Sequence, residues 1–327
     1  MQHPKRPTSA GGGGHAARRG RILAWVTLAA AFTGAATDTS AQEEAVALVV
    51  RVQGAVQVER GDDSGPAAVG LRLIEGDELR PEDGGRAILV TPSGAQQVVT
   101  EATTVRAPAV TEPTDLFTRA VATLAQAASV DATLGGRQGM IRPIPGRTSL
   151  VAPRNDLLVS STRPTFRWTA TPDARYDLML RRADGGRPEI FEVGTDTVWS
   201  LPRELDALRE GDTYAWTVFV GGRDGGRPLP QQEFRVLDAE RRGELESRLD
   251  AVRALDLDPT AEGLALSAII YHDFELFYDA TAALRELREA GAPLSPNLHR
   301  LEGEAWAELG DAEAARAAFD RATGGAH

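Results

Sequence analysis

Histidine, the side chain that most often moves protons or binds metals near neutral pH, is scarce in this sequence. The chain has 327 residues and five histidines, of which only His272, His299 and His327 lie beyond the first forty residues. His272 precedes Asp273 in a stretch with helical periodicity, where adjacent residues do not share a face. No His-Glu-x-x-His or comparable spacing occurs. The sequence therefore predicts neither a catalytic dyad nor a metal site.

The sequence also lacks the motifs that are typical of catalytic nucleophiles and of cofactor-binding loops. The chain has no cysteine, which excludes disulfides, thiolate metal ligands, a cysteine nucleophile and an acylated lipoprotein cysteine. No Gly-x-Ser-x-Gly elbow occurs, and Ser93 lies in the turn-like Pro92-Ser93-Gly94. No phosphate-binding loop or dinucleotide fingerprint follows an expected strand. We predict no catalytic residue, no cofactor and a protein that is not an enzyme.

Carboxylates are the abundant polar group, since 47 Asp and Glu face 36 Lys and Arg for a net charge of -11. This balance opposes binding to nucleic acid, which requires clustered cations. The acidic pairs in polar turns, such as Asp62-Asp63 and Glu82-Asp83, do not form a twelve-residue calcium loop. A glycan hydrolase with two facing carboxylates stays open at this stage, because nothing in the sequence singles out two acids.

The first 41 residues are expected to form an export signal. A basic, glycine-rich stretch ends in Arg18-Arg19-Gly20-Arg21, and an apolar run follows from Ile22 to about Ala36. The run is shorter than the ~20 residues that a spanning helix needs. Thr39-Ser40-Ala41 suits cleavage after Ala41, with Ala36 as the second choice and an uncleaved membrane anchor as the alternative.

Cleavage near Ala41 would place the mature protein in the periplasm or outside the cell. The arginine pair raises the twin-arginine route, but the apolar residues begin one position late for it, so we favour the general secretory route. Removal of the segment would leave a net charge of about -15. No later segment reaches the length of a membrane span, so we predict no transmembrane span in the mature chain.

Residues 45–107 are predicted to form an all-β unit. Short apolar runs, such as Val46–Val52 and Ala87–Val90, alternate with glycine-containing turns, and residues 60–66 form a polar turn. Gly76-Asp77 is interpreted as a turn that needs a positive φ rather than as a ligand site.

The glycine pattern of this unit resembles that of the FecR-like domain, which occurs in the periplasmic part of iron-dicitrate sensors and in many other exported proteins. The residues that carry the resemblance include Gly54, Gly76, Asp77 and Gly94. It covers about sixty residues of the chain. The chain departs from the sensors in lacking their anti-sigma segment and membrane helix, so their signalling activity does not carry over.

Residues 108–157 are predicted to contain a short helix and a flexible linker. Leu116 to Ala128 places Phe117, Val121 and Leu124 on one helical face, which we expect to pack on a neighbouring module. The glycines and prolines that follow predict a linker of low internal order over residues 130–157.

Residues 158–237 alternate with a period of two in several runs, including Tyr214-x-Trp216-x-Val218. With an early tryptophan, Trp168, and two glycine turns, they resemble a fibronectin type III or immunoglobulin-like sandwich. Trp168, Tyr214 and Trp216 are predicted core residues, whereas Trp199 is less certain. In such folds the resemblance implies recognition through loops or an exposed strand edge.

Residues 238–325 are predicted to be helical, beginning with an amphipathic helix from Asp238 to Leu255. Small residues at Ala280 and Ala315 are offset by nearly the ~34-residue period of tetratricopeptide repeats. The rest of the resemblance rests on Gly303, Trp306, Gly310 and Phe319. It implies binding of peptides or assembly of proteins.

The sequence thus predicts a multi-domain chain with two all-β modules and a C-terminal all-α helical-repeat segment. The favoured function is a non-enzymatic interaction or scaffold protein of the bacterial envelope, which binds an envelope protein or a cell-wall polymer through the sandwich loops and the helical groove. The alternative is an extracytoplasmic sensor or regulatory protein related to FecR-type transducers.

Overall fold

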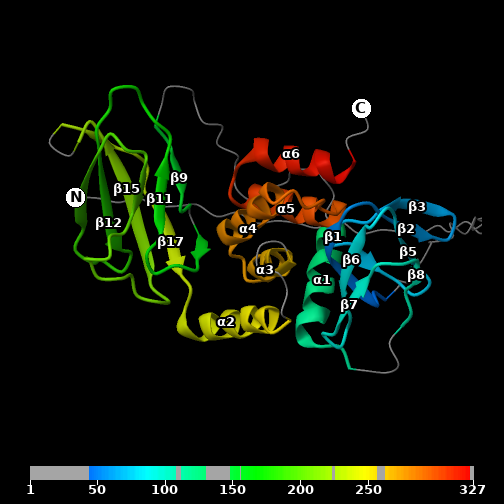
Figure 1. Cartoon of the computed structure of the whole chain (residues 1–327). Coiled ribbons are helices and arrows are strands. Elements are labelled where there is room, and N and C mark those ends of the chain that lie inside the picture. Colours follow the sequence, from blue (N-terminus) through cyan, green and yellow to red (C-terminus); the bar gives the residue numbers. More distant parts are fainter. Residues whose placement is uncertain are drawn as a thin grey trace, which may run out of the picture. The chain divides into compact units, whose positions relative to one another are not determined.

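The computed structural model describes residues 44–107, 112–129, 148–154, 156–222, 225–255 and 262–324. Within them lie two β units, a long helix between the units, and five further helices that follow the second unit (Figure 1). The predicted signal segment and residues 130–147 of the predicted linker lie outside the described residues. In the part of the chain that is described, no helix is long and apolar enough to cross a membrane.

The first β unit consists of two four-stranded antiparallel sheets. One has the order β4 (Arg72–Leu73), β1 (Ala47–Gln53), β6 (Arg86–Val90) and β7 (Gln96–Val99). The other has the order β3 (Asp63–Pro66), β2 (Val56–Arg60), β5 (Glu78–Pro81) and β8 (Thr103–Thr104). Side chains from both sheets, such as Val49, Val58 and Leu89, form one core. The predicted all-β character is confirmed, while the FecR-like assignment stays a prediction.

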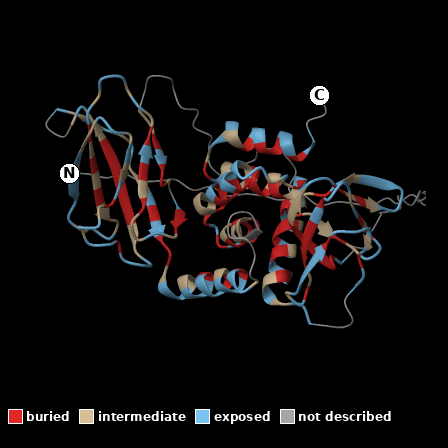
Figure 2. Cartoon of the chain, in the orientation of Figure 1, coloured by how far each residue is buried: buried red, intermediate tan, exposed pale blue. Residues whose placement is uncertain are grey.

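Strand β1 is buried on both of its faces. All five residues from Val46 to Val50 are less than 9% exposed (Figure 2). Ala47 and Val49 belong to the core between the two sheets, whereas Leu48 and Val50 belong to a second core on the opposite face. A continuous apolar run, rather than an alternating one, is what a strand covered on both faces requires.

Glycines with positive φ form the corners of this unit. Gly54, between β1 and β2, has a φ of 68°, and a Cβ there would approach the Cα of Gly85 to 3.0 Å. Gly76 has a φ of 93°, and the buried Asp77 after it accepts hydrogen bonds from Arg60 at 2.7 and 2.8 Å. The carboxylate of Asp77 is thus satisfied by a side chain of the same unit.

The polar stretch 60–66 differs from the prediction of a turn. The chain reverses at Gly61, with a φ of 59°, and β3 then pairs antiparallel with β2 from Asp63 onward. Cross-strand pairing overrides the low strand propensity of Asp63-Ser64-Gly65. Gly94, with a φ of 79°, lies in the turn between β6 and β7.

The second core joins the first β unit to the helices. The helices are α1 (Asp115–Ser129), α2 (Ala239–Arg253), α3 (Glu262–Asp273), α4 (Phe277–Glu289), α5 (Pro296–Glu308) and α6 (Ala312–Ala322). Leu48 of β1 shares this core with Phe117 and Leu124 of α1, Leu266 of α3 and Leu301 of α5. The first β unit and the helices are therefore one packed body, which the division of the sequence into separate modules did not anticipate.

A backbone contact fixes the β unit to the loop before α5. Val69 donates its amide to the carbonyl of Pro293 at 2.9 Å, and the Ser295 amide donates to the carbonyl of Val69 at 2.8 Å. Gly70 has a φ of 81°, and a Cβ there would lie 2.5 Å from Cγ of Leu298. Only a glycine leaves room for this approach of β unit and helix.

The second β unit also contains two sheets that face each other across a core. The larger sheet has the order β10 (Leu157–Val159), β17 (Gln232–Val236), β15 (Thr213–Val220), β12 (Tyr176–Arg182) and β13 (Glu189–Gly194), with β16 (Arg227–Pro228) paired to β15. The smaller has the order β14 (Val198–Ser200), β11 (Thr165–Trp168) and β9 (Leu150–Ala152). This is a β-sandwich arrangement.

Strand β9 corrects the predicted start of this unit. Ala152 pairs with Arg167 and Leu150 with Trp168, so residues 150–152 are a strand rather than part of a flexible linker. The reason is burial, because Leu150 lies in the sandwich core. Trp168 and Trp216 lie in the same core, and Nε1 of Trp216 donates to the carbonyl of Pro153 at 2.8 Å.

The last four helices form two similar pairs. Helices α3 and α5 begin at Glu262 and Pro296, a spacing of 34 residues that matches the ~34-residue repeat period. In the second pair, a Cβ at Gly303 would lie 2.7 Å from the ring of Phe319, so α5 and α6 approach closely there. Ala280 and Ala315 are fully buried on α4 and α6. The helical character of the C-terminus is confirmed, and the tetratricopeptide assignment stays a prediction.

We predict that Gly70→Ala destabilises the chain far more than Gly76→Ala. Both substitutions force an alanine to a positive φ, which costs about 1–2 kcal/mol. At Gly76 the added Cβ meets open space, whereas at Gly70 it meets Leu298, and overpacking raises the expected loss to about 3 kcal/mol or more. Urea unfolding followed by circular dichroism would measure both losses. Equal losses would contradict the close approach of Gly70 to α5.

Candidate functional site

Polar side chains of the helices pair with one another in several clusters. His272 on α3 places Nε2 3.4 Å from Oε2 of Glu304 on α5, with its ring edge-on to Phe277. Asp273, its neighbour in sequence, points to a different cluster. Among the described residues, no group of three or more His, Asp and Glu side chains could hold a metal ion.

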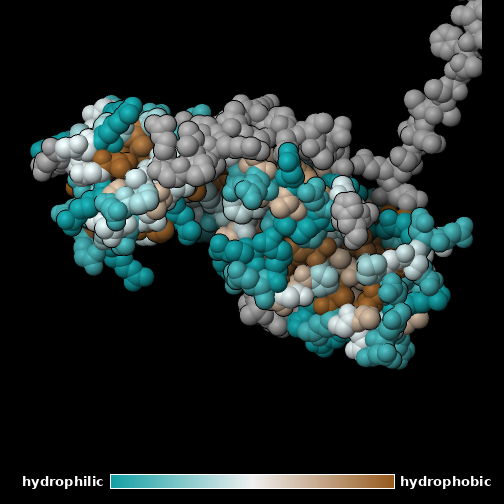
Figure 3. All heavy atoms as spheres, turned by 90° about the horizontal axis from the view of Figure 1, so that it is seen from above, coloured by the Kyte–Doolittle hydropathy of each residue, from teal (hydrophilic) through white to brown (hydrophobic). Residues whose placement is uncertain are grey.

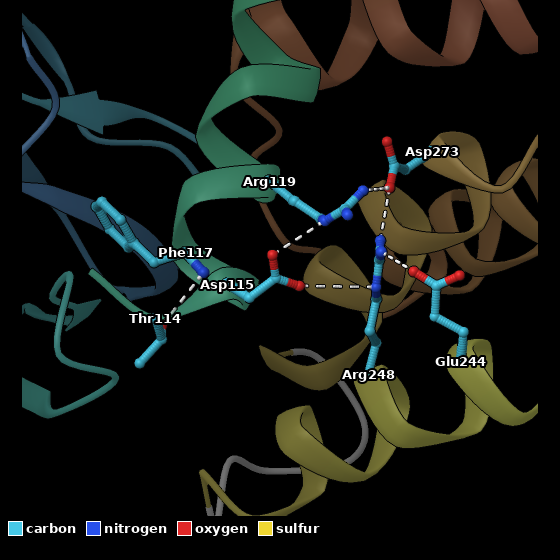
Figure 4. Close-up of polar contacts among 7 residues, drawn as sticks. All are labelled: Thr114, Asp115, Phe117, Arg119, Glu244, Arg248 and Asp273. Carbon is cyan, nitrogen blue, oxygen red and sulfur yellow. Dashed lines mark hydrogen bonds and ion pairs between the residues drawn. The ribbon is translucent and has the colours of Figure 1, made fainter. Parts of the chain in front are cut away.

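The cluster around Arg248 is the largest of these networks (Figure 4). Arg248 on α2 is 9% exposed and donates to Asp273 of α3 at 2.6 Å and to Glu244 one turn earlier. Its guanidinium also lies 3.9 Å from Asp115 at the start of α1, and Arg119 of α1 bridges Asp115 and Asp273. The cluster therefore ties three helices together through charge pairs.

We predict that Arg248→Met lowers the unfolding free energy by about 1.5–3 kcal/mol, because the charged hydrogen bonds of a buried guanidinium to Asp273 and Glu244 are lost. Arg253 is the matched control, since it pairs with Asp250 but is 69% exposed. We expect Arg253→Met to cost at most about 1 kcal/mol, as exposed ion pairs usually do. Urea unfolding would compare the two. Similar losses would mean that the Arg248 cluster is not part of the packed interior.

A second buried charge lies between α4, α5 and α6. Glu302 is 1% exposed and forms ion pairs with Arg288 and with Arg321, the latter at 3.0 Å. Burial works to raise the pKa of Glu302, but the adjacent His299 ring, a hydrogen bond from Arg321 and the charges of both arginines hold it below its ordinary value. This carboxylate stays ionised and holds the last helices together.

The sandwich contacts the helices at a junction where polar contacts lie beside the buried Leu158 and Leu237. Arg154, after β9, donates to the carbonyl of Leu309 at 2.5 Å, and it lies close to Gly310, which has a φ of 72°. Tyr278 donates to the carbonyl of Val151 at 3.2 Å, and Arg242 donates to the carbonyl of Ser160 at 2.7 Å. A side chain at position 310 would clash with Arg154 of the sandwich, which explains the glycine there.

Asp279 lies in this junction beside Tyr278. Burial raises the pKa of the Asp279 carboxyl above its ordinary value, and the hydrogen bond from the Ser160 hydroxyl lowers it only in part. The folded environment therefore disfavours the charged form of Asp279 relative to water. We expect ionisation of Asp279 to cost stability in the folded chain.

We predict that Asp279→Asn stabilises the chain at neutral pH. Because the folded pKa is raised, the ionised carboxyl costs stability above that pKa, and the cost vanishes as the pH falls to the ordinary value of 3.8. The gain from asparagine should therefore shrink with acidification. Thermal melts across this range would follow it, with Asp320→Asn on α6 as an exposed control. A gain in stability that is independent of pH would contradict a raised pKa of Asp279.

Each sheet of the sandwich has one edge against the helices and one edge without a neighbouring strand. Leu158 of β10 belongs to the core shared with the helices, and β9 accepts the hydrogen bond from Tyr278. The opposite edges are β13 in the larger sheet and β14 in the smaller. Neither strand has a second strand partner among the described residues. We call residues 189–200, which span β13 and β14, the free side.

The free side combines apolar and acidic groups at the surface. Ile190 is 40% exposed and Val198 is 47% exposed. Figure 3 shows one face of the molecule, on which apolar and polar surface are interspersed. Phe191 and Trp199 are half-buried and stack with ring centroids 4.7 Å apart, which joins the two edges. Exposed apolar groups on unpaired strands are typical of surfaces that bind another chain.

The predicted residues are distributed over the fold rather than collected at this site. Trp168, Tyr214 and Trp216 are buried in the sandwich core, and Trp306 is half-buried on α5. Trp199 is the one residue of the free side that the sequence singles out, and β13 is not among the predicted strands. The run Glu189-Ile190-Phe191-Glu192-Val193, two residues after a glycine turn, is the signal that could have found this strand.

No family model matches the chain, and no curated protein matches it. Among solved structures, the chain is similar to one titled "Cell surface anchoring domain", with 15% identity over 20% of this chain and 86% of that chain, at a TM-score of 0.18. It is also similar to the FN1–FN3 domains of chicken CNTN1, with 9% identity over 57% of each chain, at a TM-score of 0.22. Similarities this distant assign no function.

Proposed function

We propose that this chain is an exported, non-catalytic interaction protein of the bacterial envelope, which holds an envelope protein or a cell-wall polymer on its free side. The observation that carries the proposal is the exposure of two unpaired strand edges with Ile190, Val198 and the Phe191–Trp199 stack between them. An unpaired edge presents free backbone donors and acceptors, which a partner can satisfy.

In this proposal the remaining modules act as a scaffold. Residues 45–107 are a FecR-like unit, the second β unit is fibronectin type III-like, and α3 to α6 are tetratricopeptide-like. Helix α1 packs against α3 and α5 and buries Phe117 and Leu124 there. Because the chain itself covers these helices, binding in a helical groove is not part of the proposal, in contrast to the expectation from the sequence.

The non-catalytic part of the proposal is supported by how the polar groups are used. Arg248, Glu302 and Asp77 are each buried and bound to oppositely charged side chains of neighbouring elements. Such pairs fix the arrangement of elements, since a buried charge requires a nearby partner.

We predict that a photo-crosslinking residue, p-benzoylphenylalanine, at position 198 of the full chain captures a discrete partner in the producing bacterium. The exposure of Val198 lets the side chain be replaced without loss of core packing. Position 246, exposed on α2, is the matched control and should give no adduct. Mass spectrometry would identify a protein partner, and digestion of the wall would release a polymer adduct. Adducts at position 246 but none at 190 or 198 would overturn the proposal.

A further inference from the structure

Strand β13 carries the sequence Glu189-Ile190-Phe191-Glu192, with two apolar residues between two acidic ones. We propose that this edge accepts an extended protein segment with the reverse pattern, basic-apolar-apolar-basic, as an added strand. The inference rests on the proposed function and names the class of partner that the free side takes.

The backbone of β13 supports strand addition. The strand spans six residues, pairs with β12 on one side and has no strand on its other side among the described residues. Six residues are the length of an ordinary strand. An added strand would satisfy the unpaired amides and carbonyls, which supplies affinity without regard to sequence, so the side chains must supply the selection.

The side chains of β13 define which segment fits. On the outer face of the sheet, Ile190 lies opposite Met179 and Glu192 lies opposite Asp177. Asp177 has interactions of its own, whereas the exposed Glu192 has no ion-pair partner among the described residues. A basic residue on an added strand would lie beside Glu192. An apolar residue two positions away would cover Ile190 on the same face.

On the inner face, Glu189 and Phe191 again place one acidic and one apolar residue two positions apart. Phe191 lies opposite the buried Leu178, and Glu189 lies opposite Leu180 yet is itself exposed. The two faces together require two apolar residues flanked by two basic residues. The pattern is the same in both directions, so it fits an added strand that runs parallel or antiparallel.

A second copy of this chain is a poorer match for this edge than a basic segment. Antiparallel pairing of two β13 strands keeps their faces aligned, so pairing centred on Ile190 or Phe191 would place only apolar residues or Pro188 opposite Glu189 and Glu192. A segment with basic residues offers both glutamates the charged partners that a second copy lacks there.

The test uses the full mature chain and synthetic nine-residue peptides whose centre is Arg-Val-Val-Arg. Fluorescence anisotropy should show binding of this peptide and much weaker binding of its Glu-Val-Val-Glu twin. N-methylation of alternate peptide amides should abolish binding, because those amides form the strand pairing. Equal binding of the basic and acidic peptides, or of the N-methylated peptide, would overturn the inference.

Variants of the chain test the position of the peptide. Glu192→Arg should weaken binding of the basic peptide about tenfold, because one attraction is lost and one repulsion is gained. Glu246→Arg on α2 makes the same charge change and should leave binding unaltered. Ile190→Lys should weaken binding, whereas Val98→Lys on β7, another exposed edge strand, should not. Equal effects of the paired variants would place the peptide elsewhere.

The two proposals fail in different ways. If position 198 crosslinks to a partner in cells while no basic peptide binds, the proposed function stands and the strand-addition inference falls. Capture of a wall polymer would lead to the same conclusion. If the peptide binds as described but no crosslink forms in cells, strand addition at β13 is supported and the proposed binding of an envelope partner is contradicted.

Discussion

The burial of β1 and β6 on both faces is the constraint on which the rest of this structure depends. One face completes the core of the first β unit, and the other face, with Leu48, Val50 and Ile88, is covered by helices. A strand with apolar side chains on both faces cannot remain in water without a large loss of hydrophobic free energy. The first β unit therefore requires helices that lie far later in the chain, and the helices in turn require it.

Buried charge pairs give this apolar interface a definite geometry. The hydrophobic contacts of α1, α2 and α3 are non-directional, whereas the pairing of Arg248 with Asp273 of α3 and Asp115 of α1 requires a particular arrangement of these helices. Glu302 has the same role between α4, α5 and α6 through Arg288 and Arg321. Such pairs contribute little net stability, but their loss is costly, so they favour one register of the helices over others.

The sequence predicted the parts of the fold that depend on local pattern. The alternation of Tyr214, Trp216 and Val218 identified strand β15, although Ala215 and Thr217 on its other face are buried as well. The spacing of Phe117 and Leu124 identified α1. What it did not reveal depends on distant partners. Residues 150–152 become a strand only because β11 lies beside them, and β13 was missed because Glu189 and Glu192 interrupt its apolar run. The packing of the first β unit against the helices could likewise not be predicted. A local pattern indicates that a strand has an apolar face, but it does not indicate which element covers that face.

The two acidic residues of β13 also explain how an apolar edge can stay exposed. An unpaired strand with Ile190 and Phe191 at its centre is a template for association with any other strand, including its own copy. Glu189 and Glu192 flank that centre, and charged residues on an edge strand disfavour pairing with a strand that offers them no partner. The same two charges make the edge receptive to a strand with two basic residues at the same spacing. One arrangement of charge thus both disfavours unspecific pairing and selects a partner, while the helices hold the opposite edges of the sandwich and leave this side open.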